Sequence, residues 1–552
     1  MLARSGLIKN LYNKMAGPKE NYHQLKSDLV KVRAMLSLVA ALPAFFRERV
    51  TLQQAEEQIK RLLETRDERF LELVRLEIYE RPGTPYRRLL KFAGCEYSDL
   101  RAAVGHHGLD RTLERLAGEG VYLTSDEYKG KKEIVRGGLS FRVDPSDFAN
   151  RQSSPGFSIR SSGTSNKPVG TFTAIDWIAT RALGTSIFYE AHGLFNFSHA
   201  LYDAILPASS LNHLLTNVHL GKKTDRWFAR KIPFNSRLDR YYHALLTNLI
   251  VYLGRIFADG IPKPRFDDVD EIQPILNWVL EQKRQGSNCY IITVASSAAR
   301  ISRAAVEKGV SLEGTQFNVA GEPFTVAKEK AVKKAGAIAV SRYSYGNGIP
   351  VGYGCANPAF RDDVHVNQHL LAVTPHPKPL SNDGADIHPV LLTTLHPAAP
   401  RLLLNTANGD YVTLDERDCG CALGKAGLRQ HLHHIGSFEK LTSEGMNYYY
   451  GDLYELFEVT FPAEFGGGPG DYQLLEEEDH DGQTRLTLLV HPKIGDLDAD
   501  KLLARLQQAL AQDSRNHRFM TRVWQDAGTF RVRREVPYTS PRGKILPLHI
   551  PH

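Results

Sequence analysis

Hydrophobic and polar positions follow different periods along this chain, and the changes of period divide it into three parts. In the first part, from about Asn21 to Gly94, apolar residues such as Ala55 and Ile59 recur every three or four positions with charged residues between them. That spacing predicts amphipathic helices. Thr51 stands before one such run as an N-cap, and Gln54 would complete a capping box.

The second part, from about Ser158 to Leu404, alternates short apolar runs with helical stretches. The clearest series is Tyr290–Ala295, Ala298–Lys308, Gln316–Val319, Thr325–Ala335 and Ala337–Ser341. Alternation of strands with helices predicts an α/β domain with mixed or parallel sheets.

The third part has a different composition. It holds the glycine-rich segment Gly466–Gly470, an acidic run at Glu476–Asp481, a strand at Arg485–Val490 and a helix near Asp498–Gln512. These features predict a small α+β unit. We therefore expect an α/β protein with a helical N-terminal extension at residues 1–70, a large domain at 71–434 and a small C-terminal domain at 435–552.

Composition narrows the class of protein. Hydrophobic residues make up 42% of the 552 residues and charged residues 24%, which is enough apolar material for large cores. The net charge of +7 is spread along the chain, and acids alternate with bases in Arg61–Arg69, so nucleic acid is not an expected partner. Five cysteines are too few for a disulfide framework and indicate a reducing compartment.

The most apolar early segment, Met35–Phe46, is shorter than the roughly 20 residues that span a bilayer. It could lie on a membrane surface, but we expect a helix docked on the large domain. We find no secretory signal or transmembrane segment and expect a cytoplasmic protein.

The segment Ser158–Thr171 carries the first chemical signal, because hydroxyl groups and glycines are crowded ahead of Lys167. Backbone N–H groups, hydroxyls and a lysine in such a loop can wrap an anion. The Gly-Lys-Ser/Thr ending of a Walker loop is absent. An ordinary surface loop rich in serine and glycine explains the composition about as well.

Several ordered motifs resemble those of the adenylate-forming superfamily, whose members activate carboxylic acids with ATP. The loop Ser161–Pro168 resembles the superfamily's phosphate loop, with Asn166 in place of the usual glycine. The resemblance implies phosphate contacts from Ser161, Ser162, Gly163, Thr164, Ser165 and Lys167.

Three later motifs follow in the same order as in that superfamily. Ala320-Gly321-Glu322-Pro323 resembles the turn that borders the adenine, which implies nucleotide contacts from Gly321, Glu322 and Pro323. Asp410, in Asn408-Gly409-Asp410, resembles the aspartate that binds the ribose hydroxyls. Lys544, in Pro541-Arg542-Gly543-Lys544, resembles the catalytic lysine that contacts the reacting carboxylate and phosphate.

Within the superfamily, the phenylacetate–coenzyme A ligases and related proteins are the most similar branch. Tyr79-Glu80-Arg81 followed by Pro85–Leu90 resembles their N-terminal signature. The resemblance implies a ligase that uses ATP and magnesium to make an acyl-adenylate, with release of pyrophosphate. The acyl group of a small-molecule carboxylic acid would then pass to a thiol, with coenzyme A as the first expectation. The resemblance also implies that the small C-terminal domain, residues 435–552, is a mobile lid. The acid pocket is expected from Phe188–His192 past Thr293–Ser297 to Ala320–Gly321.

Alternatives stay open at this stage. The adenylate could instead pass to an acyl carrier protein or to an amine, or the chain could be a non-catalytic nucleotide-binding descendant. The sequence also leaves a homodimer open.

One motif departs from the superfamily pattern, in which an aromatic residue and then Gly-x-Thr-Glu precede the cysteine segment. Counting back from Cys355 puts Tyr343 at the aromatic position and Asn347 at the glutamate, as nucleotide-site residues. Aligning on Tyr345 instead puts Ile349 there. Neither alignment supplies a carboxylate for magnesium, and a neutral amide oxygen is a poorer ligand for a hard cation.

Three of the five cysteines gather around one histidine in the sequence. Cys355 precedes His365, and Cys419 and Cys421 lie two positions apart. Three thiols and an imidazole form the soft tetrahedral set that zinc prefers, so we expect a structural zinc site. The alternative is that these cysteines are buried small apolar residues. Other histidines within reach of the motif are His369, His431, His433 and His434.

Overall fold

The computed structural model describes the chain over most of its length. The described residues are 22–150, 154–160, 170–205, 209–230, 237–266, 272–346, 348–376, 389–437, 450–478, 484–510, 530–540 and 543–549.

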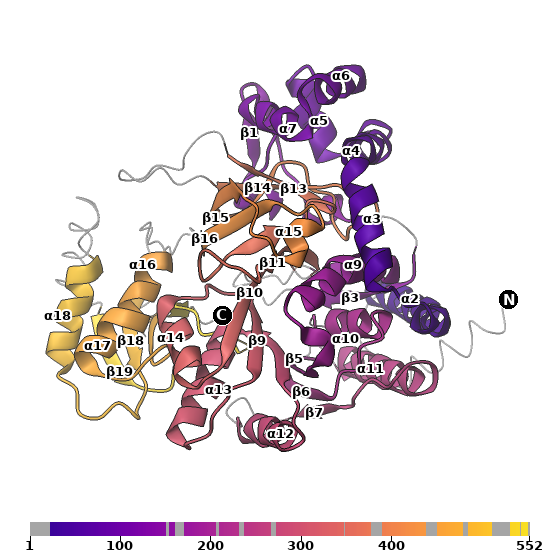
Figure 1. Ribbon diagram of the computed structural model, residues 1–552. Coiled ribbons are helices and arrows are strands. Elements are labelled where there is room, and N and C mark those ends of the chain that lie inside the picture. The colour runs from indigo at the N-terminus through magenta and orange to yellow at the C-terminus, as the bar shows by residue number, and fades with distance from the viewer. Residues whose placement is uncertain are drawn as a thin grey trace.

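A mixed sheet of twelve strands forms the centre of the described structure (Figure 1). In spatial order its strands are β13 (Leu371–Pro375), β14 (Pro389–Thr394), β15 (Thr406–Glu416), β16 (Gln430–Ser437), β12 (Val364–Val366), β11 (Ile349–Gly354), β10 (Ile338–Tyr345), β9 (Thr315–Ala320), β8 (Cys289–Val294), β5 (Ser198–Ala204), β6 (Arg226–Arg230) and β7 (Pro264–Phe266). The strands from β10 to β7 are parallel, and those from β13 to β10 are antiparallel. The predicted α/β class with a mixed sheet is confirmed.

Helices cover both faces of the parallel half. They are α9 (Ile175–Ala191), α10 (Ser210–His219), α11 (Arg237–Phe257), α12 (Gln273–Arg284), α13 (Ala295–Glu307) and α14 (Val326–Lys334). Along β8, Tyr290 and Ile292 join the core that contains α9 and α10, whereas Ile291 joins the core that contains α12 and α13. Successive side chains of a strand point to opposite faces, which is why every residue of β8 is buried.

The N-terminal helices pack on this sheet domain and on one another. They are α2 (Tyr22–Arg47), α3 (Leu52–Glu64), α4 (Arg66–Val74), η1 (Arg75–Tyr79), α5 (Pro85–Phe92), α6 (Tyr97–His107), α7 (Leu109–Gly118) and α8 (Ser125–Tyr128). Leu38, Leu42 and Phe46 of α2 are buried in the core shared with α9, which confirms the predicted docked helix. The predicted capping box of Thr51 and Gln54 is also present. Among the described helices, none has the length and apolar character needed to cross a bilayer.

Seven short elements lie between the longer ones along the described chain. They are β1 (Ile134–Arg136), β2 (Leu139–Phe141), η2 (Pro145–Phe148), β3 (Gly156–Arg160), β4 (Gly170–Ala174), η3 (Leu194–Asn196) and α15 (Ala422–Lys425). Strands β3 and β4 pair antiparallel, so the segment that joins them begins and ends at neighbouring positions.

The C-terminal residues form a second, smaller sheet with its own core, beside α13 and α14 (Figure 1). Its elements are α16 (Tyr450–Glu455), η4 (Leu456–Thr460), α17 (Phe461–Phe465), β17 (Tyr472–Glu478), β18 (Thr484–Val490), α18 (Ala499–Leu510), β19 (Phe530–Arg534) and β20 (Leu548–His549). The strand order is β19-β18-β17-β20. The predicted small α+β unit is confirmed.

Candidate functional site

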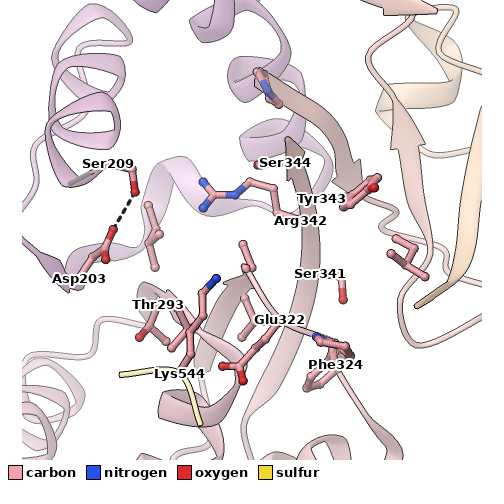
Figure 2. A pocket seen from close by; sticks show the side chains of 18 of the residues that line it. Asp203, Ser209, Thr293, Glu322, Phe324, Ser341, Arg342, Tyr343, Ser344 and Lys544 are labelled. Carbon is pink, nitrogen blue, oxygen red and sulfur yellow. Dashed lines mark hydrogen bonds between the residues drawn. The ribbon is translucent and has the colours of Figure 1, made fainter. Parts of the chain in front are cut away.

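A cavity of about 390 Å³ lies where β8, β9 and β10 end, between the large sheet and the C-terminal unit. The carboxyl ends of parallel strands are the usual place for a ligand in α/β proteins, because the connections there diverge. The cavity brings together six residues that were predicted from four motifs, namely Gly321, Glu322, Pro323, Tyr343, Asp410 and Lys544. Figure 2 shows three of them, Glu322, Tyr343 and Lys544. Thr293 and Ala320 also line it, on the course predicted for the acid pocket.

The turn after β9 needs a glycine for two reasons. Gly321 has a φ of +85°, a left-handed conformation that side chains disfavour. A Cβ at this position would also lie 2.9 Å from Cε of Lys544. The missing side chain therefore makes room for a lysine that comes from the other end of the chain.

Glu322 lines the cavity, but its carboxylate is fully buried and already occupied. The backbone N–H of Ser296 donates to its Oε1 over 2.8 Å, and the Ser296 hydroxyl donates to its Oε2 over 2.6 Å. Ser296 lies in the first turn of α13, where N–H groups lack helical partners. Glu322 therefore fixes the turn after β9 to the start of α13.

A hydrogen-bonded triangle joins Tyr343 and Asp410, which line the cavity, to Asn408. The Tyr343 hydroxyl donates to Asp410 Oδ2 over 2.8 Å, and the Asn408 amide donates to that oxygen over 2.8 Å and to the tyrosine oxygen over 2.6 Å. Burial, together with the Asp410 charge, raises the pKa of Tyr343 well above its usual value, so it stays a donor. The triangle holds the aromatic ring and the carboxylate in one arrangement.

Of the two aromatic residues considered for this position, the structure places Tyr343 on the cavity. Tyr345 instead joins a core cluster with Tyr128, their ring centroids 6.1 Å apart. A shift of register between Tyr343 and Ser344 interrupts the pairing of β10 with β11. Such an irregularity redirects side chains at the edge of a site.

Lys544 reaches the cavity from a tight turn in the C-terminal unit. Gly543 has a φ of +75°, the backbone N–H of Ser540 donates to the Lys544 carbonyl over 2.8 Å, and the Lys544 N–H donates to the Ser540 hydroxyl over 3.0 Å. Gln473 braces this turn, since its amide donates to carbonyls on both sides of it, those of Tyr538 and Leu546. Sequence reasoning missed Gln473, because a lone glutamine in a strand gives no signal.

A buried cation joins the two units beside the cavity. Lys328 of α14 is 1% exposed, and its ammonium lies 2.9 Å from Glu458 of η4 and 3.5 Å from Glu322. Burial acts to lower the pKa of Lys328, but the two carboxylates outweigh it and raise the pKa above its ordinary value. The ring of Tyr454 lies 4.6 Å from the ammonium. A second pair, Arg303 with Asp471 at 2.8 Å, also links the units.

The predicted metal residues form one compact cluster, to which the end of β11, strand β12 and the segment before α15 contribute. One ligand atom from each of Cys355, His365, Cys419 and Cys421 lies within 4.8 Å of the others. His365 Nδ1 is 2.6 Å from the Leu428 carbonyl, which makes it the protonated nitrogen and leaves Nε2 facing the thiols of Cys419 and Cys421, at 3.4 and 3.1 Å.

The chemistry of this cluster fits zinc. Metal-bound histidines typically donate their other ring N–H to an acceptor such as a backbone carbonyl, as His365 does to Leu428, and this fixes the imidazole tautomer. A hydrogen bond from Cys355 holds the pKa of the Cys421 thiol well below its usual range and raises the pKa of Cys355. Three sulfurs and one nitrogen, all within 4.8 Å of one another, could therefore hold a structural zinc ion.

The other histidines considered for the metal lie outside the four-residue cluster. Both ring nitrogens of His369 are buried without a partner among the described residues, and burial lowers its pKa to about 3. His431 Nδ1 lies 2.8 Å from Asp363, and these two residues form a second group with Cys355. His433 stacks on Phe360, with centroids 3.9 Å apart.

Comparisons with known proteins give structural matches only. No family model matches the chain, and no curated protein matches it. Among solved structures, 2-hydroxyisobutyryl-CoA ligase in complex with R3-HIB-AMP is 14% identical with a TM-score of 0.46, covering 92% of this chain and 91% of that one. The amide bond synthetase McbA from Marinactinospora thermotolerans is 12% identical with a TM-score of 0.38, covering 93% and 98%.

Another match, the anthranilate CoA ligase AuaEII with anthranoyl-AMP, is 13% identical with a TM-score of 0.42, covering 71% of this chain and 66% of that one. These proteins are ligases or synthetases by name. Structural similarity at 12–14% sequence identity assigns no activity to this chain.

Some predicted residues lie outside the described part of the chain. These are Ser161, Ser162, Gly163, Thr164, Ser165 and Lys167 of the phosphate loop, and Asn347. The strands β3 and β4 on either side of the loop, and Gly346 and Gly348 on either side of Asn347, are described, and both glycines line the cavity. Asp362 also lines it with a buried Oδ1 that has no partner among the described residues, and it had no signal in the sequence.

Proposed function

We propose that this protein activates a small carboxylic acid with ATP, and that the cavity at the ends of β8, β9 and β10 is the active site. One observation carries the proposal. Lys544, from a turn near the C-terminus, lies in the same cavity as the Gly321 turn, Tyr343 and Asp410. Four motifs that are distant in sequence and resemble one enzyme superfamily would not be expected to meet at one cavity by chance.

The chemistry follows from the charges at the site. An oxygen of the acid attacks the α-phosphorus of ATP, the new bond gives an acyl-adenylate, and the bond to the β-phosphate breaks to release pyrophosphate. Negative charge builds up on a crowded phosphorus, so catalysis is mainly positioning and charge neutralisation. Lys544 would place its ammonium beside the reacting oxygens, Tyr343 and Gly321 would border the adenine, and Asp410 would accept from the ribose hydroxyls.

The second step transfers the acyl group from the adenylate to a thiol, with release of AMP. We propose coenzyme A as the acceptor. Magnesium would accompany the phosphates of ATP, although Asn347 supplies no carboxylate at the expected metal position. Zinc at Cys355, His365, Cys419 and Cys421 would act only as a structural tie between β11, β12 and the segment before α15.

The test of the proposed function is acid-dependent release of pyrophosphate. Purified protein with MgATP and a panel of short carboxylic acids, each with and without coenzyme A, should release pyrophosphate with at least one acid. Acyl–coenzyme A should form only where coenzyme A is present. Turnover that continues at the same rate without coenzyme A would favour an amine or carrier-protein acceptor. If the protein binds ATP but releases no pyrophosphate with any acid of a broad panel, a non-catalytic role would be favoured.

We also expect Thr164→Val combined with Lys167→Ala to weaken ATP binding by roughly tenfold or more, since each change removes a donor to a phosphate. Calorimetric titration with ATP measures the affinity, and circular dichroism checks the fold. Lys60→Ala, on an exposed position of α3, is the matched control. An unchanged affinity in the folded double variant would remove this loop from the site.

A further inference from the structure

A buried arginine without a counter-ion lines the inner wall of the cavity. Arg181, on α9, is 7% exposed, and its Nε and Nη1 atoms are buried with no hydrogen-bond partner among the described residues. No ion pair joins it to any described carboxylate. Burying a guanidinium in this way is unfavourable unless something else supplies acceptors.

A second arginine meets the same space from the sheet. Arg342 of β10 directly precedes Tyr343, and its Nη1 lies 3.0 Å from a ring nitrogen of His213. Its Nε is buried and has no hydrogen-bond partner within the described part of the chain. Figure 2 shows the guanidinium of Arg342 and the ammonium of Lys544 pointing into the same open space. Burial, with a smaller contribution from the charge of Arg342, lowers the pKa of Arg181 to about 10, which still leaves it charged at neutral pH.

The carboxylate of Asp203, which also lines the cavity, is directed to other partners. Asp203 Oδ2 accepts from the Ser209 hydroxyl over 3.0 Å, as Figure 2 shows, and Oδ1 accepts from the backbone N–H of Ala204 over 2.8 Å. The inner end of the cavity therefore presents two cations that the described protein does not neutralise.

A second pocket, of about 10 Å³, shares Arg181, His213 and Arg342 with the cavity and has room for a group about the size of a water molecule. Its walls are largely polar and tied to one another. The Thr185 and Tyr353 hydroxyls are 2.8 Å apart, and the Tyr189 hydroxyl donates to Asn217 over 2.7 Å. A phenyl ring or a long alkyl chain would find neither the volume nor the apolar surface there.

We propose that the acid activated at this site is short and carries a second anionic group, in the first place a second carboxylate, which Arg181 and Arg342 bind while Lys544 faces the carboxylate that reacts. The inference rests on the proposed function and specifies its substrate class. Guanidinium groups pair with carboxylates through two parallel hydrogen bonds, and a single dianionic acid would satisfy both ends of the cavity.

The experiment compares acids in matched pairs of equal chain length: malonate with propionate, succinate with butyrate, and glutarate with valerate. Pyrophosphate release should show a kcat/KM at least about tenfold higher for one diacid than for its monoacid. In Arg181→Met and Arg342→Met this preference should fall by roughly tenfold or more, with the KM for ATP unchanged. Arg284→Met, on an exposed position of α12, should keep the preference.

Stability separates a binding role from a structural one. Because Arg181 is a buried charge with no ion-pair partner among the described residues, Arg181→Met should unfold at the same or a higher temperature than the parent, and diacids should raise the unfolding temperature of the parent only. An Arg181→Met chain that fails to fold, equal use of monoacids and diacids, or a raised KM for ATP with the preference intact would each overturn the inference. If no acid at all turns over, the proposed function fails, while the temperature shift with diacids still decides whether the arginines bind them.

Discussion

Lys544→Ala should slow acyl-adenylate formation by a factor of about 10² or more, the loss typical of removing one charge-stabilising donor from a reacting centre. ATP affinity should change little, because the ribose and adenine contacts proposed for Asp410, Tyr343 and Gly321 do not involve this ammonium. Single-turnover release of pyrophosphate measures the first step. Lys501→Ala, on an exposed position of the same C-terminal unit, is the matched control and should keep the parent rate.

The second half-reaction, measured by itself, tests whether Lys544 acts in adenylation alone. When chemically prepared acyl-adenylate is supplied with coenzyme A, thioester formation by Lys544→Ala should proceed at close to the parent rate if the lysine acts on adenylation alone. Equal damage to both steps would point to misfolding or another role. If Lys544→Ala forms acyl-adenylate at the parent rate, Lys544 has no catalytic role despite its position in the cavity.

Removal of two sulfurs from the cysteine–histidine cluster should have the largest effect on stability. Protein purified without chelator is expected to carry close to one zinc per chain, and Cys419→Ser with Cys421→Ser should lose it. Structural zinc contributes about 10 kcal/mol of binding free energy in small domains. At roughly 2 °C per kcal/mol, even partial loss should lower the unfolding temperature by about 5 °C or more. Elemental analysis and a thermal melt measure the two quantities.

The control for the zinc experiment is Cys95→Ser, which makes the same chemical change at a buried cysteine outside the cluster. It should keep the metal and lose little stability, since its partner Tyr79 can still donate. Stable, fully reduced parent protein without zinc would contradict the assignment and leave Cys419 and Cys421 as ordinary core residues.

Local features of the fold could be predicted because they depend on neighbours in sequence. The strand expected at Tyr290–Ala295 is β8 (Cys289–Val294), and the helix expected at Ala298–Lys308 is α13 (Ala295–Glu307). The pairing of distant strands could not be predicted, because the period of a strand does not name its partner. Thus the parallel pairing of β5 with β8, which places α9 over the inner end of the cavity, has no signal in the sequence.

Part of the site was hidden for a related reason. Lys328 lies in Val326–Lys334, a helix with three other lysines, and nothing in that segment distinguishes the buried lysine from the exposed ones. Arg181 lies in a helix that is apolar on every side, where a single arginine predicts little. Both residues acquire a role only when the sheet, the helices and the C-terminal unit come together around them.

The position of Lys328 has a consequence for the speed of the catalytic cycle. Its two carboxylate partners belong to different units, so any rotation of the C-terminal unit away from α14 separates Glu458 from a buried ammonium. A buried charge that loses a partner is strongly unfavourable, and water must enter as the units part. Separation of the units would then be a hydration event, and solutes that are excluded from protein surfaces would slow it, as they disfavour exposure of buried groups. The rate of turnover would in that way depend on the activity of water.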